Sequence, residues 1–240
     1  MRFSIDVGGE LELKLHQAIL LYRNEQASRY MATIHGIIQS ESGGGGAPVL
    51  GAGQLLTTAV LRELARTLGT ACPVEFLPEQ VVARTPELLA WWTPAIIRLM
   101  FFRTGSELAD ISGLRFPHPA LLFAVRSGLL YVRALRSGRR PNAQTKLYAA
   151  PYWNIGNDGV VCAGTMRAPK SAHVTTMVSW EQAFFQSEFT HPGGAGRLTK
   201  RKGGTAALWK DLAGKQSFPT ATLIPTESLS AYLRVLETRR

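Results

Sequence analysis

Cysteine is scarce in this chain of 240 residues, which contains two, Cys72 and Cys162. Two thiols cannot build the multi-disulfide framework of a small secreted domain or supply four thiolate ligands to a structural zinc. Long apolar runs are also lacking, because stretches such as 129–134 fall far below the roughly 18 residues that a membrane helix needs. Residues 1–10 show no apolar core of a secretory signal. The sequence therefore predicts a cytoplasmic protein with two free thiols and no membrane partner.

Acidic residues are few: 17 Asp and Glu stand against 27 Lys and Arg, for a net charge of +10. Nine of the basic residues lie between Arg115 and Lys170, where Asp158 alone opposes them. Such a basic segment attracts nucleic acid or an acidic protein equally well, and it can also be a solvated rim. Single-strand binders interleave basic and aromatic side chains, and this segment includes Tyr131, Tyr148, Tyr152 and Trp153.

Complete cofactor and metal motifs are missing as well. Gly51-Ala52-Gly53 resembles a dinucleotide-binding turn but lacks the third glycine, and no lysine follows it as a phosphate-binding loop requires. The five histidines are scattered without metal-ligand spacing, and His118 and His191, each beside a proline, are typical of turns. We therefore predict no cofactor and no metal site.

The pattern of apolar residues predicts an α+β protein with an antiparallel meander. Alternation over 11–16 and an apolar segment over 29–39 predict an N-terminal hairpin, followed by a glycine-rich boundary at 42–46. Two domains follow from this boundary: an N-terminal β extension over 1–48 and a main domain over 49–240.

Within the main domain, the spacing of apolar residues changes from the period of a helix to that of a strand. Residues 54–68 predict a helix that buries Leu56, Val60, Leu61 and Leu64 against the sheet. Strands are expected over 88–102 and 146–150, and the clearest hairpin joins 121–125 to 129–135 through Arg126-Ser127-Gly128. Helices are expected over 180–189, 206–212 and 227–236.

Cys162 stands in a distinctive setting. Asn154 precedes it by eight residues, the turn Asn157-Asp158-Gly159 lies between them, and small residues follow it. This arrangement predicts an accessible sulfur at Cys162, whereas Cys72, which follows an amphipathic helix, is expected to be a small buried side chain.

These residues resemble the active-site motif of ubiquitin-conjugating enzymes. In that family a His-Pro-Asn sequence and an aliphatic residue come before a glycine-containing turn, and the catalytic cysteine lies eight residues after the asparagine. Asn154, Ile155, Gly159, Val161 and Cys162 match these positions, while Tyr152-Trp153 replaces His-Pro and Ala163-Gly164-Thr165 replaces the usual residues after the cysteine. The whole chain is most similar to prokaryotic ubiquitin-conjugating-like family D of the PRTRC system, through residues 147–166, 180–185 and 189–192.

The resemblance implies a ubiquitin-conjugating-like fold, with an N-terminal helix, a meander and C-terminal helices. It further implies that Cys162 carries an activated ubiquitin-like protein as a thioester, and that Asn154 donates to the oxyanion or holds the loop that does. Its expected partners are a ThiF-like adenylating enzyme and a small ubiquitin-like protein encoded in plasmid or mobile-element cassettes. Two alternatives stay open: an inactive relative that binds the ThiF-like partner, and a basic nucleic-acid-binding accessory protein.

Overall fold

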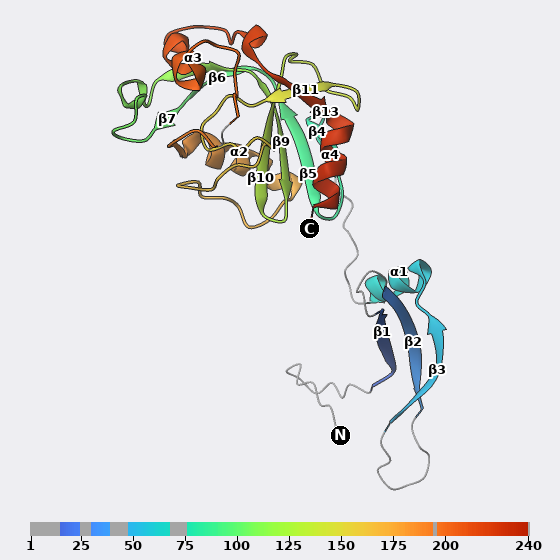
Figure 1. Ribbon diagram of the computed structural model, residues 1–240. Helices are drawn as coiled ribbons and strands as arrows, with labels where there is room; N and C mark the ends of the chain where they lie inside the picture. The colour runs from blue at the N-terminus through green and yellow to red at the C-terminus, as the bar shows by residue number, and fades with distance from the viewer. Residues whose placement is uncertain (1–14, 25–29, 39–47, 68–75, 194–195, 240) are drawn as a thin grey trace. The chain divides into compact units, whose positions relative to one another are not determined.

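The computed structural model describes residues 15–24, 30–38, 48–67, 76–193 and 196–239 (Figure 1). The chain divides into two compact units, Met1–Glu75 and Phe76–Arg240. Most of the predicted strand over 11–16 lies outside the described residues, and so does Cys72.

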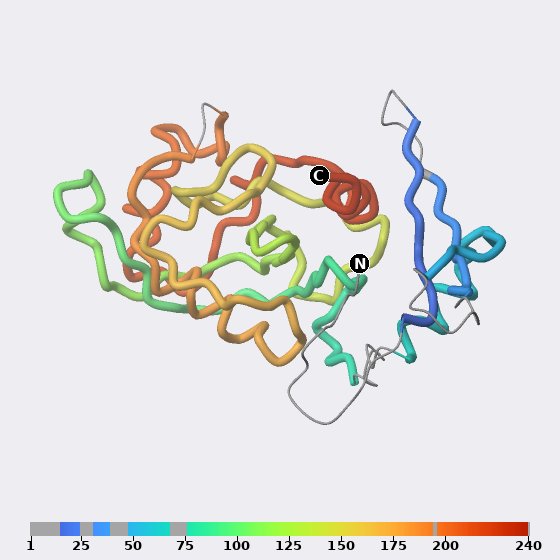
Figure 2. Tube along the Cα trace, turned by 90° about the horizontal axis from the view of Figure 1, so that it is seen from below, coloured from blue at the N-terminus to red at the C-terminus, as the bar shows by residue number. Residues whose placement is uncertain are grey.

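The first unit contains a three-stranded antiparallel sheet in the order β1-β2-β3, followed by one helix. Its elements are β1 (Gln17–Arg23), β2 (Tyr30–Ile38), β3 (Val49–Leu55) and α1 (Thr58–Thr67). The strands β1 and β2 run side by side in Figure 2 and pair antiparallel, so the predicted strand over 29–39 is confirmed, but its partner is 17–23 and not the predicted 11–16. The predicted boundary after residue 48 separates β2 from β3, whereas these two strands pair and the compact units divide after Glu75.

The predicted burial of the first helix is wrong. No residue of α1 is buried, Leu61 is 48% exposed, and Leu56, Val60 and Leu64 are only half-buried. In the described part of this unit Ile34 is the one buried residue. The sheet leaves large apolar side chains exposed, among them Leu21, Val49 and Leu55, so the sheet and the helix of this unit do not cover each other's apolar faces.

The second unit is built on a six-stranded sheet in the order β13-β11-β10-β9-β5-β4, with every neighbouring pair antiparallel. This arrangement confirms the predicted α+β class with mainly antiparallel strands. The strands are β4 (Val81–Arg84), β5 (Leu88–Thr93), β9 (Ala120–Arg126), β10 (Leu129–Leu135), β11 (Lys146–Ala149) and β13 (Pro225–Ser228).

The β9–β10 hairpin has the turn that the sequence predicts. Ser127 (φ 48°) and Gly128 (φ 75°) both adopt left-handed backbone conformations. Two such residues form the tight turn whose twist matches that of paired strands, and glycine enters this region without steric cost.

Successive side chains of a strand point to opposite faces of the sheet. Different helices cover these two faces. Helices α2 (Met177–Gln186) and α3 (Gly204–Leu212) cover one face, and α4 (Leu229–Thr238) covers the other (Figure 1). On the first face, Trp91 and Phe123 of the sheet pack with Trp180, Phe184 and Trp209 of the two helices. The second includes Ala120, Leu122, Ala124, Leu229, Tyr232 and Leu236. The second face, with its alanines, packs against α4, the last helix in the chain.

Shorter elements complete the second unit. Strand β6 (Ile96–Leu99) pairs antiparallel with β8 (Arg115–His118), and β7 (Phe101–Phe102) pairs parallel with β12 (Glu188–Phe189). Single 3₁₀ turns occupy Ala109–Ile111, Val174–Thr176 and Thr220–Thr222. Among the helices of the described residues, none has the length and apolar character to cross a membrane.

Candidate active site

The segment between Asn154 and Cys162 forms a closed turn. The backbone N–H of Cys162 donates to the carbonyl oxygen of Asn154 at 2.7 Å, and that of Gly156 donates to Val160 at 2.9 Å. Ile155 and Val161 form an antiparallel bridge between these two contacts. The spacing of eight residues thus brings the main chains of Asn154 and Cys162 side by side.

This turn is hydrogen-bonded to the main chain of β10. The N–H of Val132 donates to the carbonyl of Gly159, and the N–H of Val161 donates to that of Leu130, both at 2.8 Å. Gly159 has φ 88°, and a Cβ there would lie 2.6 Å from the hydroxyl of Tyr232 on α4. Glycine is therefore required by conformation and by space, so α4 and β10 together set the position of the turn.

Cys162 is exposed, as the turn predicts. Asn154, by contrast, is 3% exposed and has φ 61°. Its Nδ2 donates to the carbonyl of Glu188 at 2.8 Å, and its Oδ1 accepts from the N–H and the hydroxyl of Thr190 at 3.0 and 2.8 Å. The amide is thus engaged with the segment after α2, which fits the loop-holding alternative for this residue.

The segment after α2 is a part of the site that the sequence did not indicate. The N–H of Asn154 donates to the carbonyl of His191 at 2.9 Å, and the hydroxyl of Thr165 accepts from the N–H of Glu188 at 2.9 Å. A Cβ on Gly193 would collide with the main chain of Ile155. His191-Pro192 therefore lies against Asn154 in space. In the sequence, by contrast, Asn154 is preceded by Tyr152-Trp153. The sequence signal for this segment is Phe189-Thr190-His191-Pro192, which by itself indicates the family resemblance and a turn.

Tyr152 and His118 form a buried pair behind the turn. Their rings stack with centroids 5.7 Å apart, and the Tyr152 hydroxyl lies 2.9 Å from His118 Nδ1. Burial lowers the pKa of His118 to about 3 and raises the pKa of Tyr152 well above its usual value. His118 ends β8 and is not in a turn, and both side chains are neutral in the folded core.

Asp158 lies within the turn. Its carboxylate accepts from Arg239 at 2.6 Å and from the N–H of Val160 at 3.2 Å. Partial burial opposes its ionisation, but these hydrogen bonds outweigh burial and lower its pKa. Within the described residues, no group of three or more His, Cys, Asp or Glu side chains is arranged to hold a metal ion.

Comparison with known proteins identifies the family of this chain. The model of prokaryotic E2 family D matches residues 58–226, which include α1, the six strands up to Thr226 of β13, and the whole Asn154–Cys162 turn. The chain belongs to prokaryotic E2 family D. No curated protein and no solved structure matched it.

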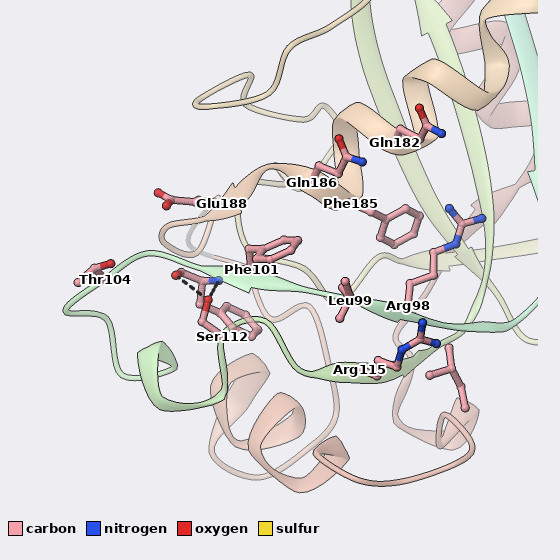
Figure 3. Close-up of a pocket in the computed structure, with 12 residues that line it drawn as sticks. Arg98, Leu99, Phe101, Thr104, Ser112, Arg115, Gln182, Phe185, Gln186 and Glu188 are labelled. Atoms are coloured by element: carbon pink, nitrogen blue, oxygen red, sulfur yellow. Dashed lines mark hydrogen bonds between the residues drawn. The ribbon is translucent and has the colours of Figure 1, made fainter.

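A cleft of about 670 Å³ lies between α2 and the paired strands β6 and β8 (Figure 3). Arg98 pairs with Glu181 at 2.9 Å and lies over the ring of Phe185. Glu188, whose main chain is held by Asn154, stands at the end of the cleft nearest the turn. The cleft therefore shares one segment with the site.

Seven of the nine basic side chains in the segment over 115–170 are exposed, whereas Arg126 is half-buried and Arg133 is buried. Arg133 is 4% exposed and pairs with Glu227, and Arg140 donates to the carbonyls of Glu79 and Val81. The aromatic side chains of the segment are mostly buried as well, namely Tyr131, Tyr152 and Trp153. These three rings are not available as a stacking surface for single-stranded nucleic acid.

Proposed function

We propose that this protein carries an activated ubiquitin-like protein as a thioester on Cys162. The observation that carries the proposal is an exposed thiol at one end of a closed turn. At the other end Asn154 is buried, and its main chain and side-chain amide are both hydrogen-bonded. Membership of an E2 family supports the same chemistry.

The proposed chemistry has two steps. The Cys162 thiolate attacks the carbonyl carbon of an activated C-terminus, which is an acyl-adenylate or a thioester, so that a C–S bond forms and AMP or the donor thiolate leaves. An amine then attacks the thioester carbonyl, a C–N bond forms, and the C–S electrons return to Cys162 as thiolate. Asn154 acts here as a positioning residue, because its amide holds the segment 188–191 and its main chain holds Cys162.

The proposed partners are a ThiF-like adenylating enzyme, which supplies the acyl-adenylate, and a small ubiquitin-like protein, which is carried. A plasmid or mobile-element cassette of the PRTRC type is the proposed setting. The arrangement as a ubiquitin-conjugating-like fold is also part of this proposal, and the antiparallel sheet with helices on both faces supports it.

The test is reconstitution of the full chain with the adenylating enzyme and the ubiquitin-like protein from the same cassette, in the presence of ATP. We expect an adduct that excess thiol cleaves, by taking up the acyl group, in the wild type and in Cys72→Ser. In Cys162→Ser we expect no thioester, and any adduct should be a more stable ester that resists excess thiol. Complex formation without any thiol-sensitive adduct would instead indicate a binding module for the adenylating enzyme.

A further inference from the structure

A chain of hydrogen bonds leads from Asn154 to an exposed histidine. The hydroxyl of Thr190 donates to Asn154 Oδ1 at 2.8 Å, and the same hydroxyl lies 2.7 Å from His191 Nδ1. His191 is exposed, whereas Asn154 is buried. The chain therefore runs from the interior of the site to its surface.

The order of donors in this chain determines which imidazole nitrogen carries the proton. Asn154 Nδ2 donates to the carbonyl of Glu188, so Oδ1 is the atom that faces Thr190. The single hydroxyl proton of Thr190 is used on that Oδ1, and its oxygen can then only accept from His191. Nδ1 of a neutral His191 is therefore protonated, and Nε2 keeps its lone pair.

His191 also lies close to Cys162 through two main-chain contacts. The carbonyl of His191 accepts from Asn154, and the carbonyl of Asn154 accepts from Cys162. Hydrogen-bonded neighbouring chains lie about 4.8 Å apart, so the main chains of His191 and Cys162 are on the order of 10 Å apart. An imidazole, an incoming amine and an acyl group on sulfur together span such a gap.

We propose that His191 is the general base of the second step, a role that rests on the proposed carrier function. As the amine nitrogen attacks the thioester carbonyl, its proton passes to Nε2 of His191. The C–N bond forms, the C–S bond breaks, and Cys162 leaves as thiolate. Thr190 and Asn154 are positioning residues that hold Nδ1 protonated.

The charged groups near His191 leave this role to the imidazole. On the elements that contact it, these groups are Asp158 and Cys162 of the turn and Glu188 of its own segment. Asp158 is paired with Arg239, and the side chain of Glu188 lines the cleft (Figure 3). Cys162 is the leaving group and cannot serve as the base.

The test uses the full chain carrying Cys72→Ser, so that Cys162 is the single thiol. A Gly-Gly peptide thioester of 2-mercaptoethanesulfonate loads Cys162 by exchange, and excess thioester is removed. Aminoacetonitrile, a weakly basic amine that is mostly uncharged where imidazoles titrate, is then added. Loss of the acyl group is followed by intact mass over a range of pH.

Four variants separate the role of the base from that of the fold. His191→Asn keeps an N–H that can donate to Thr190 but has no basic nitrogen, and His173→Asn is the matched surface control. Thr190→Val removes the acceptor that holds Nδ1 protonated, and Thr190→Ser restores it. The tautomer of His191 is read from long-range ¹H–¹⁵N spectra of the unloaded protein.

We expect His191→Asn to slow aminolysis about 10²-fold or more, the scale of general base catalysis, and to abolish the rise of the rate with pH. Thr190→Val should lower the rate and change the tautomer, whereas Thr190→Ser and His173→Asn should behave as wild type. Equal aminolysis in His191→Asn and wild type, or a proton on Nε2, would overturn the role of His191 alone. Failure of Cys162 to load would overturn the carrier function and this role with it.

Discussion

Asn154 combines two unusual features at the residue scale: it is buried, and its backbone adopts a left-handed conformation. Asparagine tolerates this conformation better than most residues. Its side chain links Glu188 and Thr190, which lie 34 and 36 residues later in the sequence. A single amide thus joins the cysteine turn to the segment after α2.

Replacing Asn154 by Ala should therefore destabilise the second unit. The carbonyl of Glu188 and the N–H of Thr190 would lose their partner in the interior, at a cost of about 1–3 kcal/mol for a buried polar group. Urea denaturation measures the loss, and exposed Gln144→Ala is the control, expected to be neutral. Equal midpoints for the two variants would show that the amide does not hold the site together.

His118 should make stability depend on pH. Its folded pKa is about 3 against an ordinary value of 6.5, so the unfolded chain binds the extra proton between these values. The free energy of unfolding is then full above about pH 6.5 and falls as the pH drops toward 3, with a slope of up to about 1.4 kcal/mol per pH unit.

Replacement of His118 by Phe should flatten this dependence, because the ring remains and the titrating group is lost. The variant should be less stable at neutral pH, since the Tyr152 hydroxyl loses its partner. Denaturant midpoints across that pH range provide the measurement. An unchanged slope would assign the acid sensitivity to other groups.

At the scale of elements, α4 determines where the cysteine turn can lie. Tyr232 on α4 donates to the carbonyl of Asp158 at 3.0 Å, and Arg133 on β10 donates to that of Asn157 at 3.0 Å. The guanidinium of Arg133 also lies over the Tyr232 ring. The helix, the strand and the turn are therefore one packed group of side chains around Gly159.

Gly159→Ala should disturb this packed group. The new Cβ would require a strained left-handed conformation and would meet the Tyr232 hydroxyl and the carbonyl of Val132. We expect a loss of at least about 1 kcal/mol in unfolding free energy and faster alkylation of a displaced Cys162. Gly138→Ala is the control, because a Cβ at Gly138 would meet nothing within 4 Å and its φ is not positive. Equal stability of the two variants would contradict the packing argument.

At the scale of the whole molecule, the apolar core belongs to the second unit. Every member of the two hydrophobic clusters lies between Val81 and Leu236. The first unit, in the part that the structure describes, contains a single buried residue. The stability of the protein should therefore come mainly from residues after Glu75.

A fragment spanning 76–240 should accordingly fold by itself. We expect a single cooperative thermal transition near that of the full chain, since burial of apolar surface is the main favourable contribution to folding. Circular dichroism and calorimetry provide the measurement, and a fragment spanning 58–240, which includes α1, is the comparison. A non-cooperative transition for 76–240 alone would show that α1 completes the core.

The sequence by itself determined the features that depend on neighbouring residues. The β9–β10 hairpin follows from two apolar runs that flank Ser127-Gly128, and the turn that exposes Cys162 follows from Asn157-Asp158-Gly159. These features were predictable because short-range spacing decides which side chains share a face and where the chain reverses. The resemblance to prokaryotic family D rested on residues 147–166 together with 180–185 and 189–192, and the family model matches residues 58–226.

Only the tertiary structure decided which distant segments meet. Both α1 and α4 have amphipathic patterns, yet only α4 is buried, against the six-stranded sheet, whereas no residue of α1 is buried. Burial of a helix face depends on tertiary packing and not on periodicity alone. His191 and Thr190 have the local pattern of a turn beside a proline, and they join the site because Asn154 bonds to their main chain across 36 residues of sequence. Contacts of this range have no local pattern, so the turn between Asn154 and Cys162 could be predicted from the sequence, but the contact of Asn154 with His191 could not.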